Sequence, residues 1–204
     1  MPRTSTFSAT GVVTAALIAA AVPLAASASA TTDEINRVEL VTAAGAGCPP
    51  DSVVLTPEDD QRILIGYAAL ALRAAAGAIG EQVSGCALTL RLKPADGYGY
   101  RITGALADLE VDLPARATGT LNVAFGHVDE APWTGSLVRT GPESRLNTVA
   151  TRGDNVARGC DVAIPDFTVT TELKLAVDPA SGADATVTAP RQTLQVVWEE
   201  CPPF

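Results

Sequence analysis

Three carboxylates occupy alternate positions in one short stretch: Asp108, Glu110 and Asp112 are separated by Leu109 and Val111. In a β-strand they would share one face, with neighbours about 7 Å apart, a separation that glycosidase acid pairs use. A catalytic acid also needs burial or a close like charge, whereas an alternating strand places its polar residues on an open, wet face. We therefore predict an acidic, solvated sheet face, with a cation or a basic partner as the alternative.

His127 is the one histidine of the sequence, so a Ser-His-Asp type of hydrolase would have to use it. No Gly-x-Ser-x-Gly elbow is present. The residues that follow, 128–130 and then Pro132, are typical of a turn. The pattern therefore predicts a solvated loop histidine rather than a catalytic one.

Trp133 lies beside Pro132 and is predicted to be exposed at a loop, where its ring could stack on a sugar. Trp198 alternates within a terminal strand and is predicted to belong to the core. A carbohydrate-binding platform normally needs more than one exposed ring. The aromatic residues alone therefore do not predict such a platform.

Calcium is the other hypothesis for the acidic residues, because extracellular calcium sites use carboxylate oxygens and can be weak. No Asp-x-Asp-x-Asp-Gly loop is present, so the signal is compositional and we expect no cofactor. The candidate ligands are Asp154, Asp161, Asp166, Asp178 and Asp184.

The first thirty residues have the organisation of a secretory signal. Arg3 precedes an apolar stretch over 12–24, and Ala28-Ser29-Ala30 supplies the small residues that a signal peptidase accepts before Thr31. We expect residues 1–30 to be a signal peptide and residues 31–204 to form one secreted, extracellular domain.

Four cysteines in an oxidising compartment predict two disulfides. Four cysteines allow three pairings, and their spacing alone does not choose among them. No two of them have the short Cys-x-x-Cys type of spacing found in structural zinc sites. The cysteines are Cys48, Cys86, Cys160 and Cys201.

Charge excludes two classes of partner. The mature chain of 174 residues would carry 13 basic and 23 acidic side chains, a formal charge near −10. Neither nucleic acid nor an anionic membrane surface attracts such a protein. The second long apolar stretch, 63–79, contains Arg73 and two glycines and is too short for a membrane span. We expect a soluble monomer that is one domain.

Alternation of apolar and polar residues dominates the mature chain and predicts strands with one dry face. About ten short strands separated by turn residues indicate an all-β fold, an antiparallel two-sheet sandwich. The stretch 68–78 is rich in Ala and Leu, and a short helix there competes with a strand that runs into a loop. The clearest alternating stretches are 38–40, 88–92, 121–125, 167–177 and 193–199.

Short motifs follow one another around the cysteines: Gly47-Cys48-Pro49, the stretch 63–67, Cys86-Ala87-Leu88-Thr89-Leu90, Tyr98-Gly99-Tyr100-Arg101-Ile102, Gly159-Cys160 and Val197-Trp198-Glu199-Glu200-Cys201. In this order they resemble the secreted domain-of-unknown-function 4360 family, over about residues 38–201. The resemblance implies an exported all-β domain with sequential pairing, Cys48 with Cys86 and Cys160 with Cys201. Its motifs are structural and imply no activity.

The sequence thus predicts a secreted, disulfide-stabilised β-sandwich that recognises an extracellular protein or glycan rather than catalysing a reaction. Two alternatives remain open. One is a secreted hydrolase acting on polysaccharide, with the 108–112 carboxylates or His127 as its site. The other is an extracellular inhibitor or adhesion module that presents its loops to another protein.

Overall fold

The structure, a computed structural model, describes residues 37–59, 61–153, 159–160 and 164–202, all within the unit Thr32–Phe204. The predicted signal segment 1–30 lies outside the described residues. In chain order the elements are β1 (Arg37–Ala44), β2 (Val53–Asp59), β3 (Arg62–Tyr67), β4 (Ala71–Ala74), β5 (Gly80–Lys93), β6 (Tyr98–Leu113), β7 (Ala117–His127), β8 (Trp133–Thr140), β9 (Glu143–Arg152), β10 (Phe167–Val177), the short 3₁₀ helix η1 (Pro179–Ser181), β11 (Ala185–Thr188) and β12 (Arg191–Glu200).

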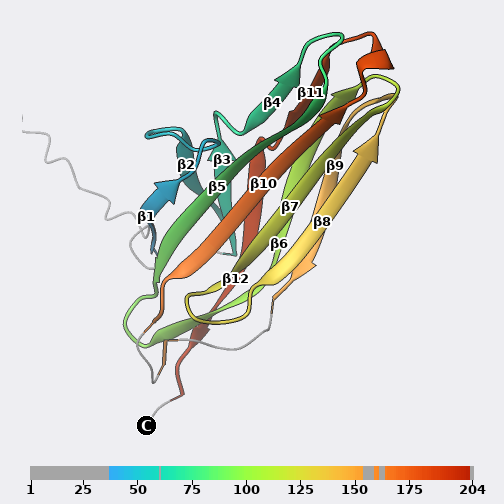
Figure 1. The fold of residues 1–204 in the computed structure, drawn as a ribbon. Helices are drawn as coiled ribbons and strands as arrows, with labels where there is room; N and C mark the ends of the chain where they lie inside the picture. Colours follow the sequence, from blue (N-terminus) through green and yellow to red (C-terminus); the bar gives the residue numbers. More distant parts are fainter. Residues whose placement is uncertain (1–36, 60, 154–158, 161–163, 203–204) are drawn as a thin grey trace, which may run out of the picture. The chain divides into compact units, whose positions relative to one another are not determined.

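Two antiparallel sheets form a sandwich, as the alternation predicted. The five-stranded sheet has the order β1-β5-β10-β7-β8, and Figure 1 shows β10 between β5 and β7. The seven-stranded sheet has the order β2-β3-β12-β6-β11-β4, with β9 paired to β6. Each strand of both sheets is paired to an antiparallel neighbour, so the turns between strands can be short.

Two breaks explain why twelve strands occur where about ten were expected. Pro190 separates β11 from β12, because proline has no N–H to donate to a ladder. The chain between β3 and β4 breaks beside it, and two bonds bridge the gap: Tyr67 N donates to Pro190 O at 3.0 Å, and Ala189 N donates to Leu70 O at 3.0 Å. β4 therefore continues the line of β3 in the sheet, and β12 continues the line of β11.

The core lies between the sheets and is filled by alternate residues of the central strands, among them β5, β6, β7 and β10. Leu88, Leu90 and Leu92 of β5 and Leu109 of β6 all belong to this core and are buried. Burial of such a side chain contributes about 1.5–3 kcal/mol. The side chains between them point outward, so each sheet has an outer face on which polar groups can gather.

The helix considered for 68–78 is wrong. Residues 71–74 form β4, which pairs with β11 from Ala71 opposite Thr188 to Ala74 opposite Ala185. Pairing and the burial of Leu70 outweigh the helical propensity of alanine, because a helix there would leave β11 with β6 as a partner on one side and no strand on the other. The described residues contain no α-helix, and therefore no helix that is long and apolar enough to cross a membrane.

Both disulfides have the sequential pairing that the family resemblance implied. Cys48 is bonded to Cys86 and Cys160 to Cys201, with Cα atoms 5.3 Å apart in each pair. The closed loops span 38 and 41 residues. In the loop-closure model each cross-link removes about 4 kcal/mol of freedom from the unfolded chain.

Candidate functional site

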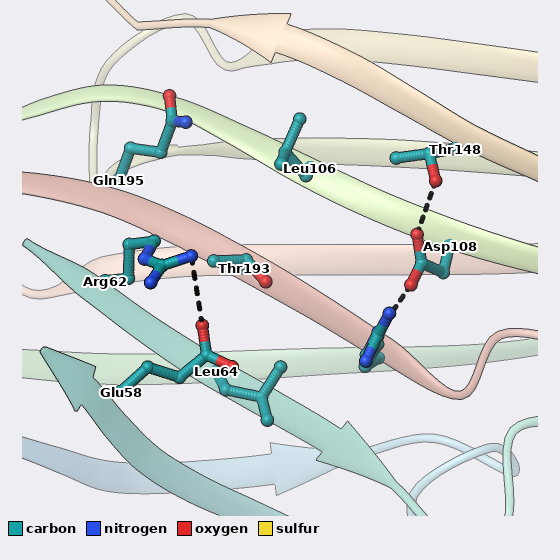
Figure 2. Close-up of a pocket in the computed structure, with 9 residues that line it drawn as sticks. Glu58, Arg62, Leu64, Leu106, Asp108, Thr148, Thr193 and Gln195 are labelled. Carbon is teal, nitrogen blue, oxygen red and sulfur yellow. Dashed lines mark hydrogen bonds and ion pairs between the residues drawn. The ribbon is translucent and has the colours of Figure 1, made fainter.

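A groove with a cavity of about 340 Å³ lies on the outer face of the seven-stranded sheet (Figure 2). Strands β2, β3, β12, β6 and β9 contribute its side chains. We call it the sheet groove, and it is lined by Glu58, Arg62, Leu64, Leu106, Asp108, Thr148, Arg191, Thr193 and Gln195.

Strand register places these residues side by side. Leu64 of β3 and Leu106 of β6 both lie opposite Thr193 of β12. Arg62 lies opposite Gln195, two residues along the same strands. The inward neighbours of these residues belong to the core, so alternation fixes the outward direction of the groove side chains.

Asp108 is the most enclosed charged group of the sheet groove. Its Oδ2 accepts a hydrogen bond from Arg191 Nε at 2.5 Å, and its Oδ1 accepts one from Thr148 Oγ1 at 2.6 Å. The Asp108 side chain is only 10% exposed, whereas that of Arg191 is 55% exposed. A solvated Asp108 was therefore the wrong expectation, because Arg191 and Thr148 cover it from the strands on either side.

The ion pair also determines what each partner can do. The hydrogen bond to Asp108 raises the pKa of the Arg191 guanidinium, which stays charged. One of its five N–H donors is directed at Asp108, and the Arg191 side chain as a whole is half-exposed. Both Asp108 oxygens are engaged within the protein. The arrangement presents donors to a ligand and holds them in place, and it is poorly suited to proton transfer.

A second charged cluster lies at the other side of the sheet groove. Arg62 Nε donates to Asp59 Oδ2 at 2.7 Å, and Arg62 Nη1 is 3.8 Å from Glu58 Oε2. The hydrogen bond from Arg62 lowers the pKa of the Asp59 carboxyl. Figure 2 shows Arg62 and Glu58 together at one side and Asp108 with Thr148 at the other. Each carboxylate that lines the groove thus has an arginine beside it.

Glu110 and Asp112 lie further along β6, outside the groove. Both are exposed and follow Asp108 at alternate positions. Their paired neighbours on β11 are Thr188 and Thr186, and neither carboxylate lines the cavity. The structure therefore does not bring the three acids of the 108–112 stretch together in one cleft.

His127 and Trp133 lie elsewhere, within an aromatic cluster. His127 ends β7 and is 3% exposed, with its ring centroid 5.3 Å from that of Phe167 and 6.0 Å from that of Tyr100. A solvated loop histidine was wrong because β7 continues through residue 127, opposite Phe167. Trp133 begins β8, is half-buried and packs 5.3 Å from Phe125, so it does not present the exposed loop ring that we expected.

The candidate calcium ligands that the structure describes are Asp166, Asp178 and Asp184. Among the described residues, no group of three or more His, Cys, Asp or Glu side chains could hold a metal ion. Asp166 accepts two hydrogen bonds from Arg91, Asp178 accepts from Ala180 N, and Asp184 accepts from Ala76 N. Asp154 and Asp161 lie outside the described residues.

Most residues of the sheet groove were missed from the sequence. Asp108 was singled out, but Arg191, Arg62 and Gln195 look like ordinary polar positions of alternating strands. Only the pairing of β3, β12 and β6 brings them to one place. A usable signal was the outward charge at the first residue of two strands, Arg62 and Arg191.

The solved structures to which the chain is similar include three of different kinds. They are TmCBM61 in complex with β-1,4-galactotriose (8% identity, TM-score 0.35, 79% of this chain and 89% of that chain), deformed wing virus, a honeybee pathogen (14%, 0.30, 100% and 66%), and a family two carbohydrate esterase from Cellvibrio japonicus (11%, 0.24, 83% and 37%). These low TM-scores carry no argument about ligand or chemistry. No curated protein matches the chain.

The family comparison agrees with the motifs around the cysteines. The family model described as Domain of unknown function (DUF4360) matches residues 34–201, which is most of the chain, and the chain belongs to that family.

Proposed function

We propose that this chain is a secreted recognition module that binds an extracellular ligand in the sheet groove. The observation that carries the proposal is the triad of Arg191, Asp108 and Thr148, in which a half-exposed guanidinium is fixed by an enclosed carboxylate. A donor group held in place before binding loses less conformational entropy when a ligand arrives. Charge-assisted hydrogen bonds from such a group are also stronger than neutral ones.

Catalysis is less well supported by the same geometry. The two carboxylates that line the sheet groove, Glu58 and Asp108, each have an arginine partner. A hydrolase acid has to hold and release a proton at a stage of the reaction, which requires an environment that favours its neutral form. His127, the other candidate of the hydrolase hypothesis, is enclosed by aromatic rings of the core.

Export is part of the proposal. The two disulfides fit an oxidising compartment, and the 12–24 apolar stretch followed by Ala28-Ser29-Ala30 fits cleavage before Thr31. Terminal sequencing of the exported protein tests this part. An amino terminus within a few residues of Thr31 is expected, and retention of residues 1–30 in exported material would contradict it.

The binding role is tested by a pull-down from culture medium and cell-wall glycans with purified protein. Arg191→Gln keeps a polar side chain but removes the charge-assisted bond to Asp108, so we expect a loss of captured material of about tenfold or more. Arg91→Gln is the matched control, since Arg91 is also a half-exposed arginine paired with an aspartate, Asp166, on the other sheet. Equal capture by wild type and Arg191→Gln would rule out the sheet groove as the site.

A further inference from the structure

The outward residues of the sheet groove lie in three rows that run across the strands. The middle row is Leu64, Thr193 and Leu106, joined by direct cross-strand pairing. Two residues further along these strands, Arg62 lies opposite Gln195. On the other side of the middle row lie Arg191, Asp108 and Thr148, linked by their hydrogen bonds. An aliphatic floor is thus bordered by polar groups on both sides.

No excess of positive charge remains in this arrangement, because Asp59 beside the groove bonds to Arg62 as well. Arg62 and Arg191 are matched by Glu58 and Asp108, each within 4 Å of its partner. An anion would gain no net Coulomb attraction from the groove, and the chain's formal charge of −9 opposes its approach. The carboxylates that would attract a cation are each already paired with an arginine. The groove therefore favours a ligand without net charge.

The polar borders offer donors and acceptors close together. Arginine only donates, carboxylates only accept, and Thr148, Thr193 and Gln195 can do both. A hydroxyl group also does both, so a ligand with several hydroxyl groups can match each border. Adjacent hydroxyls of a sugar ring fit the planar guanidinium and amide groups with paired bonds.

The floor fits the remaining surface of a sugar. Leu64 and Leu106 belong to strands separated by two strand spacings, about 9.5 Å, which is about twice the spacing of adjacent sugar rings, so a trisaccharide can place its outer rings over both. The C–H faces of the rings can pack on these two side chains, while the ring hydroxyls reach both borders. This arrangement does not depend on an exposed aromatic ring.

We infer that the ligand of the sheet groove is an uncharged oligosaccharide that lies across β3, β12 and β6, with sugar rings over Leu64 and Leu106. This inference rests on the proposed function and adds the chemical class and the direction of the ligand. An acidic polysaccharide or an extended peptide would use the same groove by different chemistry, and both are outcomes of the test.

The test is isothermal titration calorimetry of the disulfide-bonded mature protein with two panels. One panel holds neutral hexasaccharides of glucose, galactose, mannose and xylose, and the other holds oligogalacturonate, oligomannuronate and an extended polar peptide. We expect at least one neutral sugar to bind, with a Kd that changes by less than about twofold between about 50 mM and about 500 mM salt, since no net charge is screened.

Leu106→Ser tests the floor separately from the charged groups. Leu106 is already 36% exposed, so the substitution should leave the fold intact and weaken binding of the neutral sugar by about tenfold. Leu146→Ser is the matched control, because Leu146 is 50% exposed on β9 of the same sheet and does not line the groove. It should bind as wild type does.

Each remaining outcome has a definite meaning. Binding of acidic sugars or of the peptide only, lost in Arg191→Gln, would overturn the neutral class and leave the proposed function standing. Failure of every neutral sugar to bind would also overturn the inference. Binding of a neutral sugar that neither Leu106→Ser nor Arg191→Gln weakens would overturn the groove itself, and with it the proposed function.

Discussion

Two consecutive residues of β12 serve opposite sides of the same sheet. Arg191 points outward, is half-exposed and forms an ion pair with Asp108. Gln192 points inward, is buried and forms a neutral network with Tyr67 and Thr171. Alternation along one strand therefore supplies both a polar group for the core and a charged group for the groove.

The inner network joins the two sheets. Tyr67 Oη of β3 donates to Gln192 Oε1 at 3.0 Å, and Gln192 Nε2 donates to Thr171 Oγ1 of β10 at 2.6 Å. The Tyr67 and Thr171 hydroxyl oxygens are 3.3 Å apart, which closes the set. In a buried site these bonds are worth more than at the surface, and a missing partner costs correspondingly more.

The difference between the two networks separates stability from binding. The inner one is neutral and enclosed, so its groups have no surface left for a ligand. The outer one is charged and partly open, so its contribution to stability is small while its donors face solvent. Substitutions in the first should change the free energy of unfolding, and substitutions in the second should change affinity.

The largest effect is expected for Gln192→Ala. It leaves the Tyr67 and Thr171 hydroxyls short of a buried partner and opens a cavity, which together cost about 3 kcal/mol. The neighbouring substitution Arg191→Gln should cost less, about 1 kcal/mol, because Arg191 is half-exposed and the enclosed Asp108 keeps its bond from Thr148. Urea unfolding measures both, and an equal loss for the two variants would remove the distinction between the networks.

Tyr67→Phe should have an intermediate effect. It removes one hydroxyl from the inner network without opening a large cavity, so we expect a loss of about 1–2 kcal/mol. Tyr98→Phe is the matched control, since the Tyr98 hydroxyl bonds to Glu200 at the surface, and its loss should stay below about 0.5 kcal/mol. If Tyr98→Phe proved the more damaging of the two, the buried network would not be the one that stabilises the sandwich.

A smaller effect should appear when pH is changed. Burial raises the pKa of the Tyr67 phenol above its ordinary value of 10.0, so the folded state keeps a proton that the unfolded chain loses. Stability from this group is complete below about pH 10 and falls as pH rises further. The stability difference between wild type and Tyr67→Phe should therefore shrink above about pH 10, as urea unfolding at several pH values would show.

The stability contributed by the Arg62–Asp59 pair beside the groove should change at acid pH rather than at alkaline pH. The bond from Arg62 lowers the pKa of Asp59 below its ordinary value of 3.8, so the stability from this pair is present above about pH 4 and is lost as pH falls through the lowered value. Asp59→Asn should flatten this acid slope and leave the alkaline slope unchanged. A variant in which both slopes change would mean that the two networks are coupled.

Much of the fold could be predicted from the sequence, because the pattern that indicates a strand lies in neighbouring residues. Alternation over 88–92, 121–125 and 167–177 is a property of neighbouring residues, and it predicted strands that the structure contains. The stretch 68–78 was ambiguous because its strand depends on pairing with β11, which lies more than a hundred residues away. Propensity alone does not include that partner.

The candidate site was much less readable. Asp108 stood out by its alternation with Glu110 and Asp112, but its burial depends on Arg191 and Thr148 of two other strands. His127 was placed in a loop because the end of β7 could not be located from the turn-like residues after it. The burial of Asp108 and the position of His127 both depend on the register between strands that are distant in the sequence. That register is set by the whole sheet.

The most direct test of the sheet groove adds a side chain beside Arg191 without removing any contact. Gly66 of β3 lies opposite Arg191 on the outer face, and a Cβ atom added there would meet only Val54 O, at an ordinary 3.8 Å. Gly66→Thr should therefore fold as well as wild type, with a change in stability below about 0.5 kcal/mol, since threonine suits a strand. In the pull-down from cell-wall glycans we predict that it captures at least about tenfold less material than wild type. Undiminished capture by a folded Gly66→Thr protein would contradict the sheet groove as the binding site.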